Sequence, residues 1–341
     1  MGKAAIYNPY LDTLGGGERY SLSLANILAS NGWVVDVEWK EIGIKEKLEQ
    51  RLGINLSNVN FVSDIKKGSG YDLCFWISDG SIPLLHSRKI FLHFQVPFQN
   101  VDGRSLFNRM KLIRVNKVIC NSKFTKDVID NEYGVDSVVV YPPIDILKIK
   151  PKRKENYILY VGRFSKLVQS KRQDILIEAF KKFSKNVSGW KLVLVGGSDI
   201  GGKEFVGQLG KKSQGYEIEI LEGVDFKTLV DLYGKAKFFW SAAGFEVNEK
   251  NHPEQVEHFG MTTVEAMAAG AVALVFNAGG AKEIIKNEED GFLWDKVGEL
   301  IKKTEELIKD GGFCREVSRN AVEKSKLFGN EKFNQEILAL L

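Results

Sequence analysis

Two glutamates eight positions apart have the type and spacing of a ligand-binding pair. Glu257 and Glu265 lie in the segment EHFGMTTVEAMAAG, across a junction between a loop and an expected helix. Between them, Phe259, Gly260 and Met261 bring backbone N–H groups to the helix start, where an anion is favoured. A glycine there lets a ligand approach the main chain closely. The pattern therefore predicts an anion-binding loop with a carboxylate on either side.

A purely structural role competes for the second of these glutamates. Thr262 and Glu265 have the spacing of a capping box, with Thr262 as the N-cap and Glu265 at the third helical position. On spacing alone, capping and ligand binding explain Glu265 equally well. Glu257 has no such structural role, although a single glutamate in a loop is usually just solvated.

Two cations in the second half of the chain have the chemistry to hold a diphosphate. Arg163 follows the apolar run YILYVG, and Lys171 starts the amphipathic stretch KRQDILIEAF. Guanidinium and ammonium groups bind phosphate oxygens and stabilise negative charge that develops on a leaving group. Taken singly, a lysine or arginine in a loop is more often a solvated surface charge.

The first half of the chain offers a glycine loop and a histidine. Gly15, Gly16 and Gly17 follow the first apolar run and open a helix, so their loop could approach a phosphate or a sugar. Their spacing is not that of the dinucleotide-binding fingerprint, and a tight structural turn is the commoner role. His93 ends the run KIFLHF, where a parallel sheet exposes its functional edge, but a lone strand histidine is more often structural.

These residues stand at the ends of short apolar runs that alternate with amphipathic helical stretches. This alternation is the β-α-β pattern of a doubly wound parallel sheet, and it occurs in both halves of the chain. The expected strands are residues 4–8, 33–39, 59–62, 71–77, 89–94, 115–122 and 137–143, then 157–164, 190–197, 218–224, 238–242 and 271–277. The expected helices are residues 18–29, 44–52, 123–134, 171–186, 226–236, 262–270 and 330–341.

The alternation of apolar runs and amphipathic stretches is interrupted near residue 146, where ILKIKPKRKEN is basic, lacks periodicity and contains a proline. We therefore expect two α/β domains of similar size joined by a linker. The expected parts are an N-terminal domain, a linker, a C-terminal domain and a terminal helix that packs back on the first domain, over residues 1–146, 147–155, 156–325 and 326–341. Ligands in such folds bind outside the carboxyl ends of the strands, so the cleft between the domains is the expected site.

Composition excludes several classes of protein. Of the 341 residues, 44% are hydrophobic and 27% charged, which excludes wholesale disorder. The net charge of 48 − 44 = +4 is too small to indicate a nucleic-acid partner. No apolar stretch approaches the roughly 20 residues of a membrane-spanning helix, and the N-terminus lacks a signal-peptide core. Three widely spaced cysteines in apolar runs indicate reduced core residues, so we expect a cytoplasmic protein.

The segment around the two glutamates resembles the E-x7-E motif of retaining glycosyltransferases of family 4, the glycosyl transferases group 1. The family pattern, approximately E-x-F-G-x-x-x-x-E-A-M-A-x-G followed by a Gly-Gly loop, stands complete in residues 257–270 and in NAGGAKEII after them. The resemblance implies the GT-B fold, two Rossmann-like parallel-sheet domains facing across a cleft. It also implies that Glu257 lies near the donor sugar and that Glu265 binds the nucleotide ribose, which a helix-cap carboxylate can also do.

The resemblance assigns roles to the other candidates as well. In the family, a Gly-Arg after a strand and a lysine downstream grip the donor pyrophosphate, which implies this role for Arg163 and Lys171. Their spacing of eight is a few residues longer than usual, so Lys166 stays an alternative, although the helix that follows favours Lys171. His93 is implied in acceptor positioning or stabilisation, and His258, inside the E-x7-E segment, is a weaker candidate.

The function implied is retaining transfer of a sugar from a UDP- or GDP-sugar to a hydroxyl of a glycan, a lipid-linked glycan or a small molecule. The chain contains no Asp-x-Asp motif, so we expect no metal, no other cofactor and metal-independent turnover. Two alternatives remain, an epimerase or phosphorylase of the same fold and a non-catalytic subunit that binds sugar nucleotides. The expected catalytic residues are Glu257 and His93, and the expected donor-binding residues are Gly15, Gly16, Gly17, Arg163, Lys171, Phe259, Gly260, Met261, Thr262 and Glu265.

One basic amphipathic segment has two interpretations. Residues 103–117, GRSLFNRMKLIRVNK, place cations among apolar residues at helical spacing. A domain helix with a solvated basic face is the more common explanation. A helix of this composition can also lie on an anionic membrane, which leaves peripheral contact with the inner membrane face open.

Overall fold

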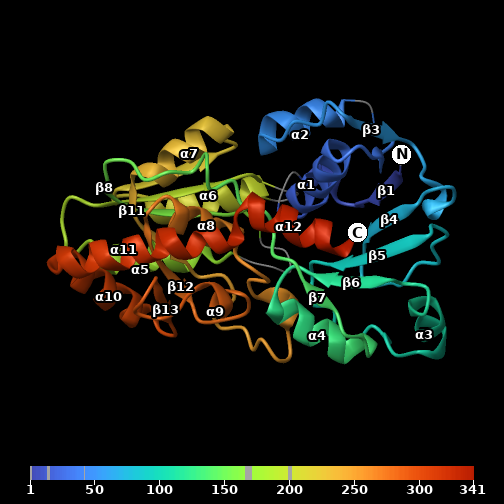
Figure 1. The fold of residues 1–341 in the computed structure, drawn as a ribbon. Coiled ribbons are helices and arrows are strands. Elements are labelled where there is room, and N and C mark those ends of the chain that lie inside the picture. The colour runs from blue at the N-terminus through green and yellow to red at the C-terminus, as the bar shows by residue number, and fades with distance from the viewer. Residues whose placement is uncertain (1, 14–15, 42, 166–170, 199–201) are drawn as a thin grey trace. The chain divides into compact units, whose positions relative to one another are not determined.

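The computed structural model describes residues 2–13, 16–41, 43–165, 171–198 and 202–341 (Figure 1). The chain divides into two compact units. Unit 1 consists of Met1–Pro143 together with Asn330–Leu341, and unit 2 consists of Ile144–Gly329. Between the last strand of unit 1 and the first strand of unit 2, residues 140–154 form no helix or strand apart from a bridge of Ile144 to Gly329.

Unit 1 is built on a seven-stranded parallel sheet in the order β3-β2-β1-β4-β5-β6-β7. Its inner strands are nearly continuous apolar runs, as expected where a sheet is covered on both faces. The strands are β1 Lys3–Tyr7, β2 Val34–Glu38, β3 Val59–Val62, β4 Leu73–Ile77, β5 Lys89–Phe94, β6 Lys117–Cys120 and β7 Val138–Val139.

Amphipathic helices cover this sheet. The helices of unit 1 are α1 Gly16–Ser30, α2 Ile44–Leu52, α3 Leu106–Leu112, α4 Lys123–Tyr133 and α12 Asn330–Leu340, with short 3-10 turns η1 Leu11–Thr13 and η2 Lys66–Gly68. Helix α1 buries Tyr20, Leu24 and Leu28, four residues apart, against the sheet. Helix α12 adds Phe333 and Ile337 to the same core and contacts α1, although it is 300 residues away in sequence (Figure 1).

Unit 2 is built on a six-stranded parallel sheet in the order β10-β9-β8-β11-β12-β13. The strands are β8 Glu155–Val161, β9 Lys191–Gly196, β10 Ile218–Glu222, β11 Ala236–Ser241, β12 Val272–Phe276 and β13 Phe292–Trp294. Both sheets are therefore doubly wound and parallel, which confirms the predicted fold class.

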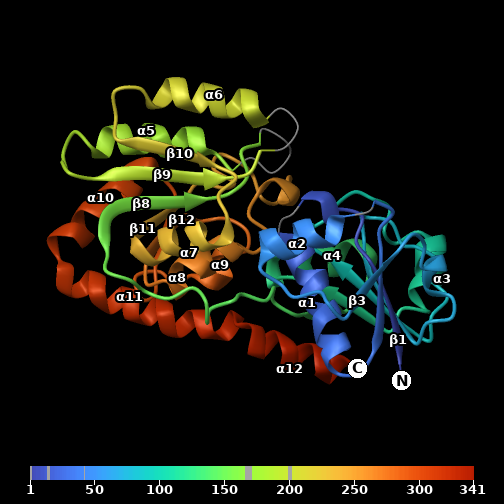
Figure 2. The same cartoon turned by 90° about the horizontal axis from the view of Figure 1, so that it is seen from above.

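The helices of unit 2 form two groups. They are α5 Gln173–Phe183, α6 Gly202–Ser213, α7 Phe226–Lys235, α8 Met261–Ala268, α9 Ala281–Ile284, α10 Val297–Lys309 and α11 Gly311–Ser325, with 3-10 turns η3 Pro253–Gln255 and η4 Lys326–Phe328. Helix α5 contacts α6 and α10, whereas α8 contacts α7 and α11. In Figure 2, α5 and α6 lie on one side of the strands, and α7, α8 and α11 lie on the other.

Each sheet has one point at which its strand order reverses. In unit 1 the reversal falls between β1 and β4, and in unit 2 it falls between β8 and β11. Loops leave such neighbouring strands toward opposite faces, and the crevice between them at the carboxyl ends is where α/β sheets bind ligands. The segments after β8 and β11, which carry the predicted donor-binding residues of the second half, therefore start at one crevice.

Within the part of the chain that the structure describes, no helix is both long enough and apolar enough to cross a membrane.

Candidate active site

The turn after β8 is closely packed and carries Arg163. The N–H of Gly162 donates to the carbonyl of Val195 at 2.9 Å, which continues the pairing of β8 with β9. A Cβ atom at Gly162 would overlap the hydroxyl of Tyr160, and one at Gly196 would overlap the carbonyl of Gly162. Glycines are therefore required at both positions. The turn leaves Arg163 exposed at the carboxyl end of a central strand.

Gln173, the first residue of α5, holds this turn in place. Its Nε2 donates to the carbonyl of Arg163 at 2.8 Å and lies 3.4 Å from the carbonyl of Gly162. The side chain is fully buried, and its Oε1 has no hydrogen-bond partner among the described residues. Gln173 was not predicted from the sequence, where its only signal is its place two positions after Lys171.

The structure brings Lys171 and Glu257 together, although they are 86 positions apart in sequence. Lys171 Nζ donates to Glu257 Oε2 at 2.9 Å, and the two side chains are only 14% and 21% exposed. Limited access of water weakens the screening of this pair, so it binds more strongly than a surface ion pair. The alternative cation Lys166 lies outside the described residues.

Arg172 ties the start of α5 to the segment after β11. Its backbone is left-handed, with φ of 51°, and its Nη1 donates to the carbonyl of Phe245 at 2.7 Å. The guanidinium also lies 5.5 Å from the centre of the Phe245 ring, within the range of a cation–π contact. Neighbouring residues of one chain segment, Lys171 and Arg172, therefore both bind the segment between β11 and α8.

The Gly-Gly loop after β12 fixes the backbone of Glu257. The N–H of Gly280 donates to the Glu257 carbonyl at 2.7 Å. A Cβ atom at Gly279 would overlap that same carbonyl oxygen, and one at Gly280 would overlap the carbonyl of His258. The side chain of His258 is itself engaged, with Nε2 at 3.1 Å from the carbonyl of Glu254. These contacts explain why two glycines follow the E-x7-E segment.

Helix α8 starts at the predicted anion-binding loop. Its N-cap is Gly260, which has φ of 109°, a conformation that favours glycine strongly. Phe259 before it is buried and packs edge-to-face on Phe328, with ring centres 5.5 Å apart. Met261 and Thr262 are partly exposed in the first turn, where backbone N–H groups lack partners inside the helix.

The capping-box explanation of Glu265 is wrong. The helix begins at Met261 and its N-cap is Gly260, with no side-chain cap bond, so Thr262 lies inside the first turn. The carboxylate of Glu265 is turned inward and accepts a hydrogen bond from the hydroxyl of Tyr233, on α7, at 2.7 Å. Glu265 is 7% exposed. Tyr233 was not predicted, because no short-range pattern connects it to a residue 32 positions away.

In unit 1, the start of α1 meets the segment after β5. A Cβ atom at Gly17 would overlap Oε1 of Gln95, whose Nε2 lies 3.3 Å from the Gly17 carbonyl. Asn121, directly after β6, donates to the carbonyl of Gln95 at 3.1 Å. Gly16 is exposed beside this contact, whereas Gly15 lies outside the described residues. Gln95 and Asn121 were missed, and the available signal was a polar amide directly after an apolar run.

His93 does not lie at the exposed sheet edge, and that expectation is corrected. It is the penultimate residue of β5 and is fully buried, stacked on Tyr20 with ring centres 4.0 Å apart. Neither ring nitrogen has a hydrogen-bond partner among the described residues. Burial lowers the pKa of His93 to about 3, against the opposing effect of the Ile119 backbone. The imidazole is therefore neutral, and Gln95 occupies the edge instead.

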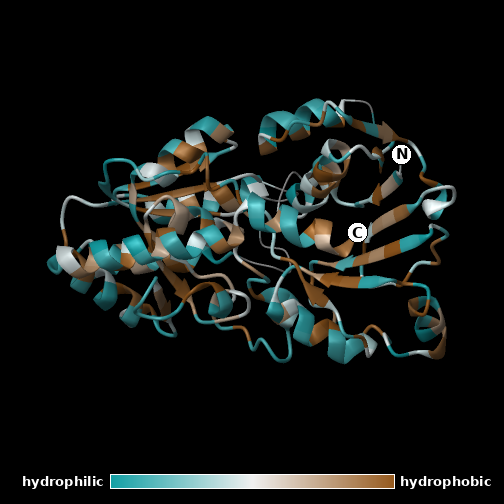
Figure 3. Cartoon of the chain, in the orientation of Figure 1, coloured by the Kyte–Doolittle hydropathy of each residue, from teal (hydrophilic) through white to brown (hydrophobic). Residues whose placement is uncertain are grey.

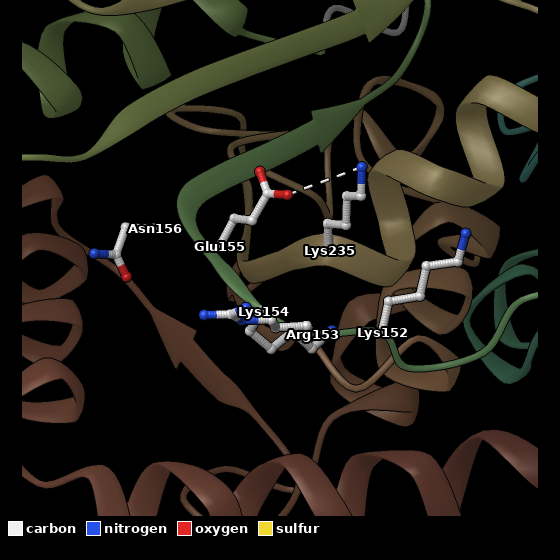
Figure 4. A pocket seen from close by; sticks show the side chains of 6 residues that line it. All are labelled: Lys152, Arg153, Lys154, Glu155, Asn156 and Lys235. Carbon is white, nitrogen blue, oxygen red and sulfur yellow. Dashed lines mark ion pairs between the residues drawn. The ribbon is translucent and has the colours of Figure 1, made fainter.

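A hollow of about 610 Å³ lies at the opposite, amino-terminal end of β8 (Figure 4). Its lining residues are Lys152, Arg153, Lys154, Glu155, Asn156 and Lys235. Lys154 donates to the carbonyls of Gly234 and Ala269, and burial lowers its pKa to about 8. Lys152 pairs with Asp231 at 2.8 Å. Most of these cations thus bind neighbouring groups of unit 2, and the hollow is at the wrong end of the strand for the site.

Among the described residues, no group of three or more histidine, cysteine, aspartate or glutamate side chains is arranged to hold a metal ion.

Comparison with known proteins identifies the family of unit 2. Residues 144–324, just over half of the chain, match the family described as glycosyl transferases group 1. The GDP-Man:Man(3)GlcNAc(2)-PP-Dol alpha-1,2-mannosyltransferase of Dictyostelium discoideum is 27% identical over 241 residues, 67% of this chain and 46% of the relative. An uncharacterized glycosyltransferase of Methanocaldococcus jannaschii is 28% identical over 240 residues, 68% of this chain and 61% of the relative. The chain spans about half the length of the curated relatives it matches.

Solved structures share the whole fold. A glycosyltransferase from Rickettsia africae matches with a TM-score of 0.77 at 18% identity, over 99% of this chain and 97% of its own. Anabaena HepE in complex with UDP-glucose matches with a TM-score of 0.76 at 19% identity, over 99% of both chains. At these identities the likeness establishes the fold, and it confirms the GT-B prediction. From the match over residues 144–324, the chain belongs to the glycosyl transferases group 1 family.

Proposed function

We propose that this protein is a retaining glycosyltransferase that moves a sugar from a nucleotide-diphospho-sugar to an acceptor hydroxyl. The observation that carries the proposal is the Lys171–Glu257 ion pair, which joins the segment that follows β8 to the segment that follows β11. In this pair, Lys171 is the cation that would bind the diphosphate, and Glu257 is the carboxylate that would lie near the donor sugar. Gln173 ties the exposed Arg163 to the same segment.

Lys171 and Arg163 would hold the diphosphate. Both are cations at the carboxyl end of the sheet, where an anionic ligand replaces water around them. In the structure Lys171 binds Glu257, so the incoming diphosphate has to share or take over this lysine. The N-terminal turn of α8, at Gly260, Met261 and Thr262, adds backbone N–H groups and a helix dipole that favour the same negative charge.

Glu265 would bind the ribose of the donor nucleotide. One oxygen of its carboxylate already accepts from Tyr233, which fixes the side chain in one orientation. A carboxylate can accept at several lone pairs, so this bond leaves capacity for ribose hydroxyls. Because Glu265 is mostly buried, such a bond would form with little competition from water.

The reaction we propose breaks the bond between the anomeric carbon and the β-phosphate oxygen. The acceptor hydroxyl attacks the anomeric carbon from the face that the nucleotide is leaving, and its proton passes to the departing phosphate. The products are a glycoside of unchanged anomeric configuration and a nucleoside diphosphate. Arg163 and Lys171 would stabilise the charge that develops on this leaving group. His93 stays a predicted acceptor-side residue.

We propose that the two cations replace a divalent metal. They supply positive charge at the diphosphate without a metal's requirement for several oxygen ligands. Turnover should be unchanged in EDTA. Complete loss of activity in EDTA, with recovery on adding Mg²⁺ or Mn²⁺, would contradict metal independence.

The names of the relatives suggest which substrates to test first. The mannosyltransferase relative is named for GDP-mannose and a dolichyl-diphosphate-linked glycan, and a structural neighbour holds UDP-glucose. We propose a GDP- or UDP-sugar as donor and a lipid-linked glycan as acceptor. Donor binding by thermal shift, with GDP-mannose and UDP-glucose in parallel, separates the two nucleotides because a ligand of the native state raises the melting temperature.

The decisive assay follows release of nucleoside diphosphate with and without acceptor. Release that depends on acceptor, with an α-linked donor giving an α-linked product by NMR, supports retaining transfer. A β-linked product would exclude retention. Acceptor-independent interconversion of sugar nucleotides would indicate an epimerase, and consumption of phosphate a phosphorylase. A raised melting temperature without any turnover would indicate a non-catalytic subunit.

A further inference from the structure

Helix α3 of unit 1 and its C-cap residue Ile113 turn four large apolar side chains toward solvent. Their exposed fractions lie between 60% and 84%, for Leu106 (76%), Phe107 (74%), Met110 (60%) and Ile113 (84%). No residue of α3 is buried, and Figure 3 shows hydrophobic and hydrophilic residues side by side on this helix. A surface helix ordinarily buries its apolar stripe against the core. Contiguous exposed apolar side chains indicate an interaction surface.

One apolar side chain and several polar bonds hold α3 on unit 1. Leu112 is half-buried and packs against the apolar cluster that contains Leu92 and Phe94. Lys111 Nζ donates to the carbonyl of Ile82 at 2.8 Å, and Arg104 Nε donates to the carbonyl of Asn131 at 2.9 Å. Ser105 caps the helix, with its hydroxyl accepting from the N–H of Asn108 at 3.4 Å. The helix is thus fixed in this orientation while Leu106, Met110 and Ile113 stay exposed, and the Phe107 ring is contacted by Lys111, with Nζ 5.6 Å from its centre.

The apolar stripe is flanked by positive charge. Residues 103–117 contain five cations and no aspartate or glutamate, namely Arg104, Arg109, Lys111, Arg114 and Lys117. At 100° per residue, Leu106, Met110 and Ile113 fall within one stripe, with Arg109 on one side of it and Arg114 on the other. Glu132, which lies next to the start of this segment, is occupied by the backbone N–H groups of Asn100, Val101 and Gly103. Asp102, which is exposed directly before the segment, offsets one of the five positive charges, so the field around α3 is still positive.

We propose that α3 docks unit 1 on the surface of an anionic lipid bilayer. The four apolar side chains would enter the boundary between headgroups and acyl chains, and the flanking cations would meet the lipid phosphates. The proposal rests on α3 alone and holds whether or not the protein transfers sugars.

The charge decides between a bilayer and a second copy of this chain. Two copies joined through α3 would bring five cations of one molecule against five of the other, and like charges in contact destabilise an interface. An anionic bilayer instead offers negative charge and an apolar interior at the same surface. The occupant that fits both properties of α3 is therefore the membrane.

The first test is flotation of the full chain with vesicles. One set is phosphatidylcholine alone, and the other is a two-to-one mixture of phosphatidylcholine and phosphatidylglycerol. We expect binding to the mixed vesicles, little binding to the neutral ones, and release as the salt concentration rises. Equal binding to both vesicles, or binding to neither, would overturn the proposal.

The second test removes the exposed apolar side chains and the cations of this surface in two separate variants. Phe107→Ser with Ile113→Ser should lower the partition coefficient at least about tenfold, because less apolar area enters the interface. Replacing Arg109, Arg114 and Lys117 by glutamine should lower it about a hundredfold at low salt. Both sets of residues are exposed, so the melting temperature should stay unchanged.

Matched variants control for loss of apolar area and of charge elsewhere. Leu147→Ser with Leu327→Ser removes two side chains that are 65% and 57% exposed on unit 2, and it should leave vesicle binding intact. Replacing Lys203, Lys211 and Lys212 of α6 by glutamine removes the same charge as the α3 variant. If these controls lose as much binding as the α3 variants, the proposal fails. It also fails if the serine variant of α3 only converts a dimer into a monomer, which would assign this face to a second copy.

Discussion

Lys171 links the observed ion pair to the proposed chemistry, because one ammonium group cannot bind Glu257 and a diphosphate fully at the same time. Its ammonium group lies 2.9 Å from Glu257. A diphosphate brings more negative charge than one carboxylate, so Lys171 would turn toward the phosphates and release Glu257 toward the sugar. In the proposed mechanism, the ion pair would hold both groups in position for the donor.

Removing either of the proposed diphosphate cations should slow transfer far more than it destabilises the fold. For Lys171→Gln and Arg163→Gln we expect kcat to fall about 10²- to 10³-fold, since each loses charge stabilisation of the leaving group. The measurement is steady-state release of nucleoside diphosphate. Lys181→Gln, which removes an ion pair to Glu178 on the same helix α5, is the control and should keep the wild-type rate. Retention of kcat in both site variants would exclude these residues as the diphosphate cations.

The buried His93 should make stability depend on pH. Its pKa is about 3 in the folded protein and 6.5 ordinarily, so between these values the unfolded chain binds a proton that the folded chain does not. Stability contributed by neutral His93 is complete above about pH 6.5 and is lost as the pH falls, by at most about 1.4 kcal/mol per pH unit.

Replacing His93 by phenylalanine isolates the contribution of this histidine to the pH dependence of the free energy of unfolding. The variant keeps a ring to stack on Tyr20 but removes the titration, so its free energy of unfolding should fall less between about pH 7 and about pH 5. Urea unfolding at the two pH values measures the difference. His86→Gln, at an exposed histidine of the same unit, should behave like the wild type. Loss of transfer at unchanged stability would instead support the acceptor role predicted for His93.

At the scale of elements, the loop after β12 positions the E-x7-E segment through contacts that only glycine permits. Gly279 has φ of 57°, and any Cβ there would overlap the Glu257 carbonyl. Gly279→Ala should therefore displace the Glu257 backbone and lower kcat at least about tenfold, by the sensitivity of catalysis to small misplacements. Gly298→Ala, in α10 with open space around it, should leave kcat unchanged. Equal rates for both variants would show that the loop does not position Glu257.

Local pattern predicted the elements better than it predicted the contacts between them. The periodicity of residues 44–52 matches α2 without error, and the apolar runs at 59–62 and 89–94 match β3 and β5. The start of α8 was predicted one residue late, because Thr262 has the residue type and spacing of an N-cap. The observed N-cap is Gly260, whose left-handed backbone has no side-chain signal in the sequence. Tyr233, Gln173 and Gln95 were missed because their partners are set by packing rather than by spacing.

The orientation of α3 was also beyond the sequence. An amphipathic segment such as residues 103–117 has the same pattern whether its apolar stripe faces the core or the solvent. The structure resolves this through the packing of Leu112 on the core and through polar bonds from Lys111 and Arg104 to the carbonyls of Ile82 and Asn131. Such bonds join positions 27 to 29 apart and have no local signature.

At the scale of the whole molecule, the chain leaves unit 1 at Pro143 and returns to it at Asn330. Helix α12 therefore completes the core of the first unit only after the second unit has been made. Phe333 is its main apolar contribution, 2% exposed and edge-to-face with Tyr20 at 5.0 Å between ring centres. The stability of unit 1 thus depends on the last dozen residues of the sequence, whereas the proposed diphosphate residues all belong to unit 2.

This division predicts two separable responses in unfolding. Phe333→Ala should destabilise unit 1 by roughly 3–5 kcal/mol, because it removes a buried ring and leaves a cavity. A nucleoside diphosphate that binds Arg163 and Lys171 should stabilise unit 2 by about 2.7 kcal/mol at about 100 times its Kd. Hydrogen exchange, which resolves the two units by peptide, should show the first change in β1, α1 and α12 and the second in β8, α5 and α8. Leu338→Ala, at a 42% exposed position of α12, should change neither. Protection of unit 1 alone would contradict a donor site at Arg163 and Lys171. A bound ligand raises the free energy of opening of the unit that binds it, so a nucleotide bound to unit 2 has to protect the strands of unit 2.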